Sequence, residues 1–411
     1  MITKNTEITG SKKRMRIAAF SLFIAQGIVF ASWASRLPDI KADFNVKDLM
    51  QFSVLLFLIP VGKFIAIPMV GFLFPRIGSK KTVLLSILGF VLSLLIIGFI
   101  SNNIYTLGAI MLLFGMFWNM TDISLNTQAI EVEKLYGSPI IATFHASWSL
   151  AACIGALIGY GMINLGIAPR LHFVIITLLA IMLIAGNYKF LPEIKTNNAN
   201  EKEVAAKKKE IGLWQLIKNK QVPETLLIHL GIIWLLALIV ENTMFEWSDI
   251  YFQSVIKAPE SMQIGFLVFM TMMFLGRIIT NILYSFWDKV TVLKIAGVLI
   301  FTGFLISSMG IDMADELVFK VIINSTGFML IGLGISCVVP TLYSIVAEKS
   351  ATPPGLALTI MSGISFAGPL IAPLLVGAIS HNFAMEWAYL AVGLVGLCIL
   401  LISFLSKSMR K

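Results

Sequence analysis

The sequence predicts an all-α membrane protein with twelve transmembrane helices in two pseudo-symmetric six-helix bundles. Three observations predict this class: an apolar composition, a series of long apolar runs and an internal repeat. Of the 411 residues, 58% are hydrophobic and 13% are charged, whereas soluble domains have about 25% charged residues. A water-soluble globule could not cover so much apolar surface, and the same composition excludes a disordered chain.

The apolar runs are long enough to cross a bilayer, which takes roughly 20 mostly apolar residues. Continuous runs of this length are typical of helices and exclude the short alternating strands of a membrane barrel. The twelve predicted spans are 17–37, 51–74, 82–101, 104–130, 140–163, 170–190, 224–249, 262–286, 291–311, 317–347, 354–380 and 384–406.

One long polar stretch between the sixth and seventh spans divides the chain. The predicted segments are an N-terminal cytoplasmic segment (1–16), a six-helix bundle (17–191), a cytoplasmic linker (192–223), a second six-helix bundle (224–406) and a cytoplasmic tail (407–411). Within the linker, apolar residues between Ile211 and Ile217 stand beside two lysines. This pattern fits either a short amphipathic helix on the membrane surface or a solvated tether.

The basic residues are distributed unevenly between the two sides of the predicted membrane. The termini and the loops that share their side hold 23 of the 31 lysines and arginines. By the positive-inside rule, both termini of this multi-pass protein are predicted to be cytoplasmic. The net charge of +9 is therefore a topology signal and does not indicate nucleic acid.

The two halves resemble each other in sequence. Gly62-Lys63 in the second span corresponds to Gly276-Arg277 in the eighth, and the segment 115–131 matches 332–348 at a constant offset of 217. Two parallel six-span repeats joined by a cytoplasmic linker are typical of one architecture of secondary transporters.

The loop after the second span carries a motif that extends this likeness. It reads Gly71-Phe-Leu-Phe-Pro-Arg76-Ile-Gly78-Ser-Lys80-Lys, which resembles the GxxxDRxGRR-like motif of the major facilitator superfamily, with Pro75 in place of the usual acid. The stretches SWASRLPDIK, DISLNTQAIEVE and FHASWSL are similar to a bacterial inner-membrane subgroup related to fucose permease. The resemblance implies the major facilitator fold, transport by alternating access and a cavity lined by spans 1, 4, 7 and 10.

Five charged residues fall inside predicted spans, where each needs a physical reason because a charge at mid-bilayer costs roughly 2.5–3.5 kcal/mol. They are Lys63, Asp122, Glu241, Glu246 and Arg277. Asp122 is the first candidate for proton coupling and Glu241 the second; alternatively, Asp122 forms a permanent ion pair with Lys63 or Arg277. The two basic residues fit either binding of an anionic solute or fastening of spans. Glu246 lies near the outer end of its span, where we expect contact with solvent.

Polar residues also form stripes at helical spacing, which a lipid-facing helix would not carry. They indicate either a cavity or hydrogen bonding between helices, and His145 fits either titration or packing. For Arg36, snorkelling to the lipid headgroups is the other interpretation. The substrate-cavity candidates are Gln26, Trp33, Arg36, Trp118, Asn119, Asn126, Trp148, Ser149, Glu246, Ser336 and Tyr343; the proton-coupling candidates are Asp122, Glu241 and His145. Structural candidates are Lys63, Arg277, Gly71, Arg76, Gly78 and Lys80.

No motif of an enzyme or an ATPase is present, since the chain lacks a P-loop, HExxH and GxSxG. The three cysteines form no CxxC and no Cys/His cluster, so no metal or other cofactor is expected. The predicted function is proton-coupled symport of a small polar, sugar-like solute by a monomer. Its partners are the solute, protons and membrane lipid. The alternatives are efflux of an amphiphilic compound by proton antiport, or a ligand sensor built on a transporter fold.

Overall fold

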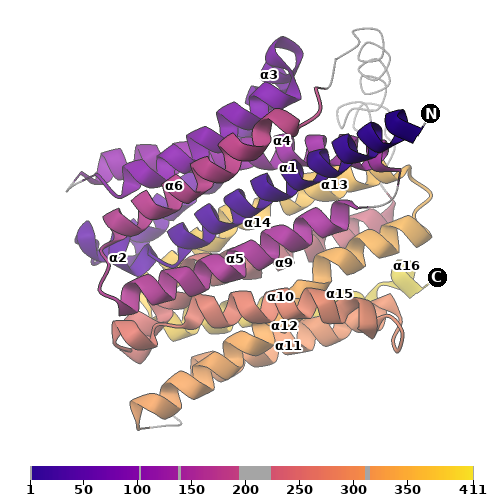
Figure 1. Cartoon of the computed structure of the whole chain (residues 1–411). Coiled ribbons are helices and arrows are strands. Elements are labelled where there is room, and N and C mark those ends of the chain that lie inside the picture. Colours follow the sequence, from indigo (N-terminus) through magenta and orange to yellow (C-terminus); the bar gives the residue numbers. More distant parts are fainter. Residues whose placement is uncertain (1, 101–102, 138–139, 194–223, 311–314, 411) are drawn as a thin grey trace. The chain divides into compact units, whose positions relative to one another are not determined.

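The computed structural model describes residues 2–100, 103–137, 140–193, 224–310 and 315–410 (Figure 1). Within these ranges the chain is helical and holds no strand. In chain order the elements are α1 (Ile2–Ala34), α2 (Leu37–Asp43), α3 (Leu49–Ile97), α4 (Ile104–Tyr136), α5 (Ile141–Asn164), α6 (Pro169–Asn187), η1 (Tyr188–Phe190), α9 (Thr225–Tyr251), η2 (Phe252–Ile256), η3 (Glu260–Met262), α10 (Gly265–Leu283), α11 (Lys289–Met309), α12 (Leu317–Lys349), α13 (Pro354–Ser365), α14 (Ala367–Asn382), α15 (Met385–Leu405) and α16 (Lys407–Arg410).

The chain forms two compact units. Unit 1 comprises Met1–Lys47 and Val54–Thr196, and unit 2 comprises Asp48–Ser53 and Asn197–Lys411. Most of the predicted linker, including the segment 211–217 with its two alternative predictions, lies outside the described residues.

Eleven helices in the described part of the chain are long and apolar enough to cross a membrane. One of them, α3, has 49 residues, so at 1.5 Å per residue it is about 70 Å long and far exceeds the hydrocarbon core of a bilayer. Its helical path breaks at Gly78, where φ is 78° and ψ is 161°. This break separates the second and third predicted spans, which confirms twelve crossings and the all-α membrane class.

The break at Gly78 depends on glycine, because a side chain strains a backbone of this conformation. Arg76 lies just before the break: its Nη1 donates to the Phe72 carbonyl at 2.9 Å, and its guanidinium lies 3.4 Å from the centre of the Phe72 ring. After the break, Lys80 donates to the Lys189 carbonyl at 3.0 Å. The motif residues therefore shape the turn and fasten it to η1. A Cβ at Gly71 would meet no atom within 4 Å, so packing does not require glycine there.

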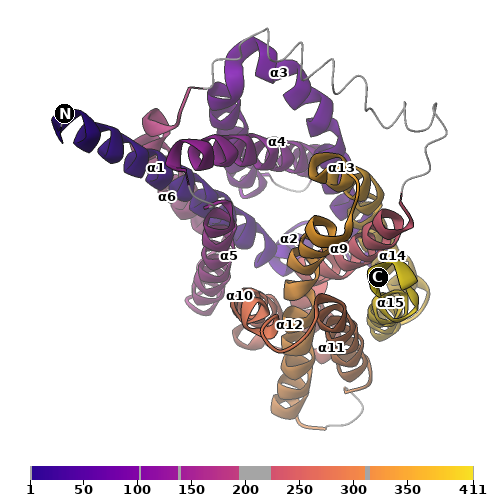
Figure 2. The same cartoon turned by 90° about the vertical axis from the view of Figure 1, so that its right-hand side faces the viewer.

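Each unit has one helix that packs against most of the others. In unit 1, α1 packs against α4, α5 and α6, and these neighbours surround it in both views (Figures 1 and 2). In unit 2, α9 packs against α10, α12, α13, α14 and α15. The polar residues Gln26 on α1 and Glu246 on α9 are accordingly buried.

Candidate functional site

Two half-buried side chains of opposite charge lie in the membrane-spanning part of unit 1, Asp122 on α4 and Lys63 on α3. The positive charge of Lys63 stabilises the carboxylate of Asp122. Gln26 on α1 donates a hydrogen bond from Nε2 to Oδ1 of the same carboxylate. Two neighbouring helices, α1 and α3, therefore supply favourable partners for one carboxylate in a region of low dielectric constant.

The ammonium of Lys63 also rests on an aromatic ring. Its Nζ lies 3.4 Å from the centre of the Trp118 ring, well inside the range of about 6 Å for a cation–π interaction. Trp118 and Asp122 are four residues apart on α4, so they project from neighbouring positions of one helical face. Lys63 thus interacts with both the Trp118 ring and the Asp122 carboxylate.

A glycine precedes the basic residue in both units and brings two helices together. A Cβ on Gly62 would overlap the carbonyl oxygen of Leu112 on α4, and a Cβ on Gly276 would overlap the Ser336 hydroxyl on α12. The absence of a side chain at these positions lets α3 approach α4 and α10 approach α12. The repeated Gly-basic pair therefore has a steric explanation.

The two asparagines of the span-four stripe bond to backbone. Asn119 donates to the carbonyl oxygen of Lys63 at 2.6 Å, and Asn126 donates to the carbonyl oxygen of Asp122 at 2.9 Å. Asn119 thereby links α4 to α3, which matches the interpretation of this residue as a bond between helices. Asn126 bonds within its own helix.

Trp118 belongs to an aromatic cluster that includes Phe30, Trp33, Phe90 and Phe114. Ring centres lie 4.8 Å apart for Phe30–Trp118 and 6.0 Å apart for Phe90–Trp118. Trp33 is 1% exposed and packs 5.3 Å from Phe114. Trp33 is therefore a buried member of this aromatic cluster, and the packing of the cluster fixes the position of the Trp118 ring.

The polar stripe of α5 is less enclosed. His145 is exposed and meets Phe23 edge-on at 5.7 Å, whereas the half-buried Trp148 stacks on Phe30 at 5.5 Å. Ser149 is buried, and its hydroxyl donates to the His145 carbonyl. Trp148 is thus the member of this stripe that joins the aromatic cluster.

Unit 2 has its own ion pair. Arg277 Nη2 on α10 lies 3.8 Å from Glu241 Oε1 on α9, and the two side chains are 31% and 17% exposed. Arg277 thus pairs with Glu241. Each unit therefore places one acid near the basic residue of its repeated Gly-basic pair.

The predicted cavity residues of α12 have different environments. Tyr343 is 42% exposed and meets Trp234 of α9 edge-on at 5.4 Å. Ser336 is 2% exposed and donates to the Leu333 carbonyl. Tyr343 is therefore partly exposed, whereas Ser336 is packed against α10.

The prediction that Glu246 contacts solvent is wrong. Glu246 is 5% exposed, and every residue from Asn242 to Tyr251 is buried. The reason is the central position of α9, which packs against five other helices of unit 2. Position along the sequence does not reveal how many helices enclose a span.

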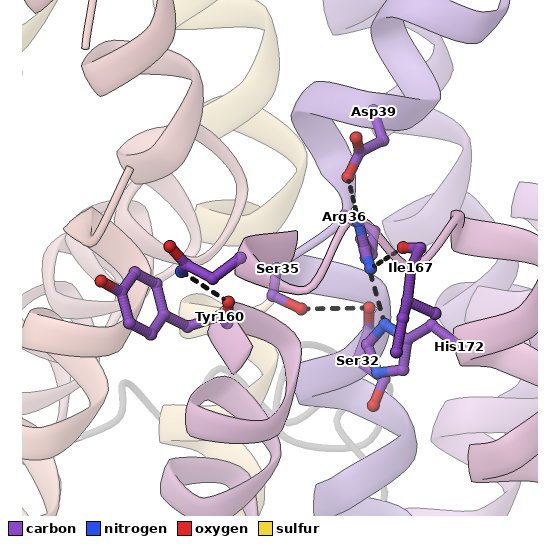
Figure 3. Close-up of polar contacts among 8 residues, drawn as sticks. Ser32, Ser35, Arg36, Asp39, Tyr160, Ile167 and His172 are labelled. Carbon is purple, nitrogen blue, oxygen red and sulfur yellow. Dashed lines mark hydrogen bonds and ion pairs between the residues drawn. The ribbon is translucent and has the colours of Figure 1, made fainter. Parts of the chain in front are cut away.

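Arg36 lies between α1 and α2 in a buried polar cluster (Figure 3). Its Nε donates to Nδ1 of His172 at 3.1 Å, its Nη1 to Asp39 at 3.1 Å and its Nη2 to the Ile167 carbonyl at 2.6 Å. The Arg36 side chain is 3% exposed, so the snorkelling interpretation is wrong. Because Nδ1 of His172 accepts a hydrogen bond, the neutral ring carries its proton on Nε2.

Sequence reasoning missed both side-chain partners of Arg36. Asp39 follows three residues later in the sequence, a spacing that places the two side chains together on a helical turn. His172 lies 136 residues away, and no spacing rule connects the two positions. The cluster joins the α1–α2 junction, α2, the loop before α6 and α6 itself. Arg36 therefore holds these parts of unit 1 together.

Comparison with known proteins identifies the family. The model of the Major Facilitator Superfamily matches residues 17–354. The chain belongs to this superfamily. It is therefore a membrane transporter and not an enzyme.

Similar curated proteins are also transporters or membrane proteins. The chain is 28% identical over 373 residues to the uncharacterized transporter y4wD of Sinorhizobium fredii, covering 90% of this chain and 93% of that one. It is 26% identical over 380 residues to an uncharacterized MFS-type transporter of Yersinia pestis, covering 91% of each. It is 26% identical over 395 residues to the membrane protein MosC of Rhizobium meliloti, covering 95% of this chain and 90% of that one.

Solved structures agree in fold. A variant of the nucleoside transporter NupG has a TM-score of 0.72 at 13% identity and covers 98% of this chain and 100% of that one. A second NupG structure has a TM-score of 0.68 at 15% identity, with 97% and 100% covered. At this identity the likeness establishes the fold alone.

Proposed function

We propose that this transporter is a proton-coupled symporter of a small polar solute that contains a ring, such as a sugar or a nucleoside. The observation that carries the proposal is the half-buried carboxylate of Asp122, held by Gln26 and by the charge of Lys63. A carboxylate in this setting can be neutralised by a proton without leaving the membrane-spanning region. Asp122 is the proposed proton carrier.

The proposed solute follows from the groups around Asp122. The aromatic cluster around Trp118 extends through Phe30 to the half-buried Trp148. Because Lys63 covers the Trp118 ring, the face of Trp148 is the part of this cluster that suits a flat or pyranose-like ring. Asp122, four residues from Trp118 on α4, and its partner Gln26 supply polar atoms near this cluster. The fold likeness to a nucleoside transporter adds nucleosides to the sugars as candidates.

Glu241 is the proposed second titrating group. It lies on α9 beside Arg277 at 3.8 Å, so each unit has one carboxylate whose cation competes with a proton for it. Trp234 and Tyr343 are the proposed solute contacts of unit 2. We also propose that the protein lies in the inner membrane with both termini on the cytoplasmic side. The distribution of lysine and arginine supports this orientation.

Uptake by proteoliposomes with an imposed pH gradient tests the proposal. Radiolabelled nucleosides and sugars are supplied outside at acidic pH to vesicles that are alkaline inside. Symport predicts accumulation of at least one solute above its outside concentration, and loss of that accumulation when an ionophore collapses the gradient. Accumulation driven by the opposite gradient would instead indicate antiport, and saturable binding without flux would indicate a ligand sensor.

A further inference from the structure

The Trp118 ring and the Asp122 carboxylate together form a site of the kind that binds organic cations. An aromatic face and a neighbouring carboxylate attract an ammonium by cation–π and charge–charge interactions, which are strongest where water is excluded. Trp118 is 7% exposed, and Asp122 lies four residues further along α4. In this protein, the ammonium that occupies the site comes from Lys63, 3.4 Å from the ring centre.

The position of Lys63 is built into the packing of α3 on α4. Asn119 donates to the backbone carbonyl of Lys63 at 2.6 Å, and Gly62 lets the α3 backbone approach Leu112 of α4. The ring is fixed on its other sides by Phe30 at 4.8 Å and Phe90 at 6.0 Å. Both the ammonium and the surface on which it rests are therefore tethered.

We propose that Lys63 is a specificity-determining residue, a tethered ammonium that occupies the Trp118–Asp122 cation site and excludes cationic solutes. With Lys63 and Asp122 both ionised, the pair has no net charge, so a solute cation would add an uncompensated charge to a region of low dielectric constant. The cargo is accordingly not a cation. The exclusion of cationic cargo rests on the proposed transport function. The cation site depends only on Trp118, Asp122 and Lys63, so it is tested by binding, without transport.

The substitution Lys63→Ala removes three carbons and the ammonium, which together correspond to n-propylammonium. The variant leaves Asp122 without its cation and opens the face of Trp118. We expect it to melt at a lower temperature than the wild type in detergent, and n-propylammonium to raise that temperature and quench tryptophan fluorescence saturably. The uncharged n-propanol should bind at least about tenfold more weakly, because only the charged molecule makes the cation–π interaction. The wild type should show no saturable response to either compound.

The double variants Lys63→Ala/Trp118→Leu and Lys63→Ala/Asp122→Asn each remove one half of the site and should lose the preference for n-propylammonium. Lys80→Ala is a matched control, because Lys80 lies over the Tyr188 ring at 5.4 Å but its Nζ makes a solvent-exposed contact; it should gain no binding. If Lys63→Ala does not fold, Lys63→Ser offers the same vacancy with a polar side chain. Saturable binding of n-propylammonium by the wild type, or equal binding of the amine and the alcohol by a folded variant, would overturn the proposal. Failure of solute uptake alone would count against the proposed function and leave the cation site intact.

Discussion

Replacing Arg36 with leucine removes the guanidinium that joins four parts of unit 1. In the native structure its three hydrogen bonds go to Asp39, the Ile167 carbonyl and Nδ1 of His172, at 2.6–3.1 Å. His172 is 0% exposed, so water does not replace the lost donor there. Leucine fills part of the volume and supplies no hydrogen bond.

The cost follows from the acceptors that lose their donor. A buried acceptor without a partner costs about 1–3 kcal/mol, and the Ile167 carbonyl and Nδ1 of His172 are two such acceptors. Asp39 is 27% exposed and regains water, so its loss is discounted. With two such acceptors, we expect the free energy of unfolding to fall by about 2–6 kcal/mol.

Equilibrium unfolding in detergent micelles, followed by circular dichroism, measures this change. Arg170→Leu is the matched control, since Arg170 is exposed and rests on the Phe99 ring; it should change stability by less than about 1 kcal/mol. The double variant Arg36→Leu/His172→Phe should lose less than the sum of the two single variants, because each removes the same hydrogen bond. A loss below about 1 kcal/mol for Arg36→Leu, or strict additivity, would refute the fastening role.

Three further predictions concern other parts of the chain. Gly78→Ala should destabilise the protein by about 1–3 kcal/mol in the same unfolding assay, because alanine is strained at φ 78° and ψ 161°; an unchanged stability would contradict the need for glycine. Glu241→Gln should lower the melting temperature more than the double variant Glu241→Gln/Arg277→Met does, because the single change leaves Arg277 without its acid; equal shifts would show that the pair contributes nothing. Asp288 caps α11 through Thr291, and these hydrogen bonds hold the pKa of its carboxyl below the usual value. A lowered native pKa means that this stabilisation is complete above about pH 4 and is lost as pH falls through the native pKa. The stability difference between wild type and Asp288→Ala should therefore be about 0.5–2 kcal/mol at pH 7 and should shrink under acid; a difference independent of pH would exclude the charged cap.

The sequence was sufficient for the membrane class and the number of crossings, because both depend on the length and polarity of apolar runs. Gly78 lies between the second and third predicted spans, and the helix breaks there. The repeat of Gly62-Lys63 in Gly276-Arg277 also carries structural meaning, since both glycines permit close contact between helices.

The partners of the charged residues were beyond sequence reasoning. Helical periodicity shows which residues share a face, but it does not show which helix lies opposite that face or how the helix is rotated. The sequence therefore left open which acid pairs with Arg277, and the structure places Glu241 3.8 Å away from it. For the same reason, the pairing of Arg36 with His172 and the burial of Glu246 were not predicted.

The most direct test of the account is the energy coupling of Asp122→Asn in proteoliposomes. The asparagine Oδ1 keeps the acceptor that Gln26 uses, so the variant loses the titrating group and little else. Glu131→Gln, which makes the same change at a 30% exposed acid of α4, is the control. With a solute found by the uptake screen, proton coupling through Asp122 predicts that Asp122→Asn exchanges labelled for unlabelled solute but no longer accumulates it against a gradient, while the control accumulates it normally. Accumulation by Asp122→Asn at the wild-type rate would contradict the account.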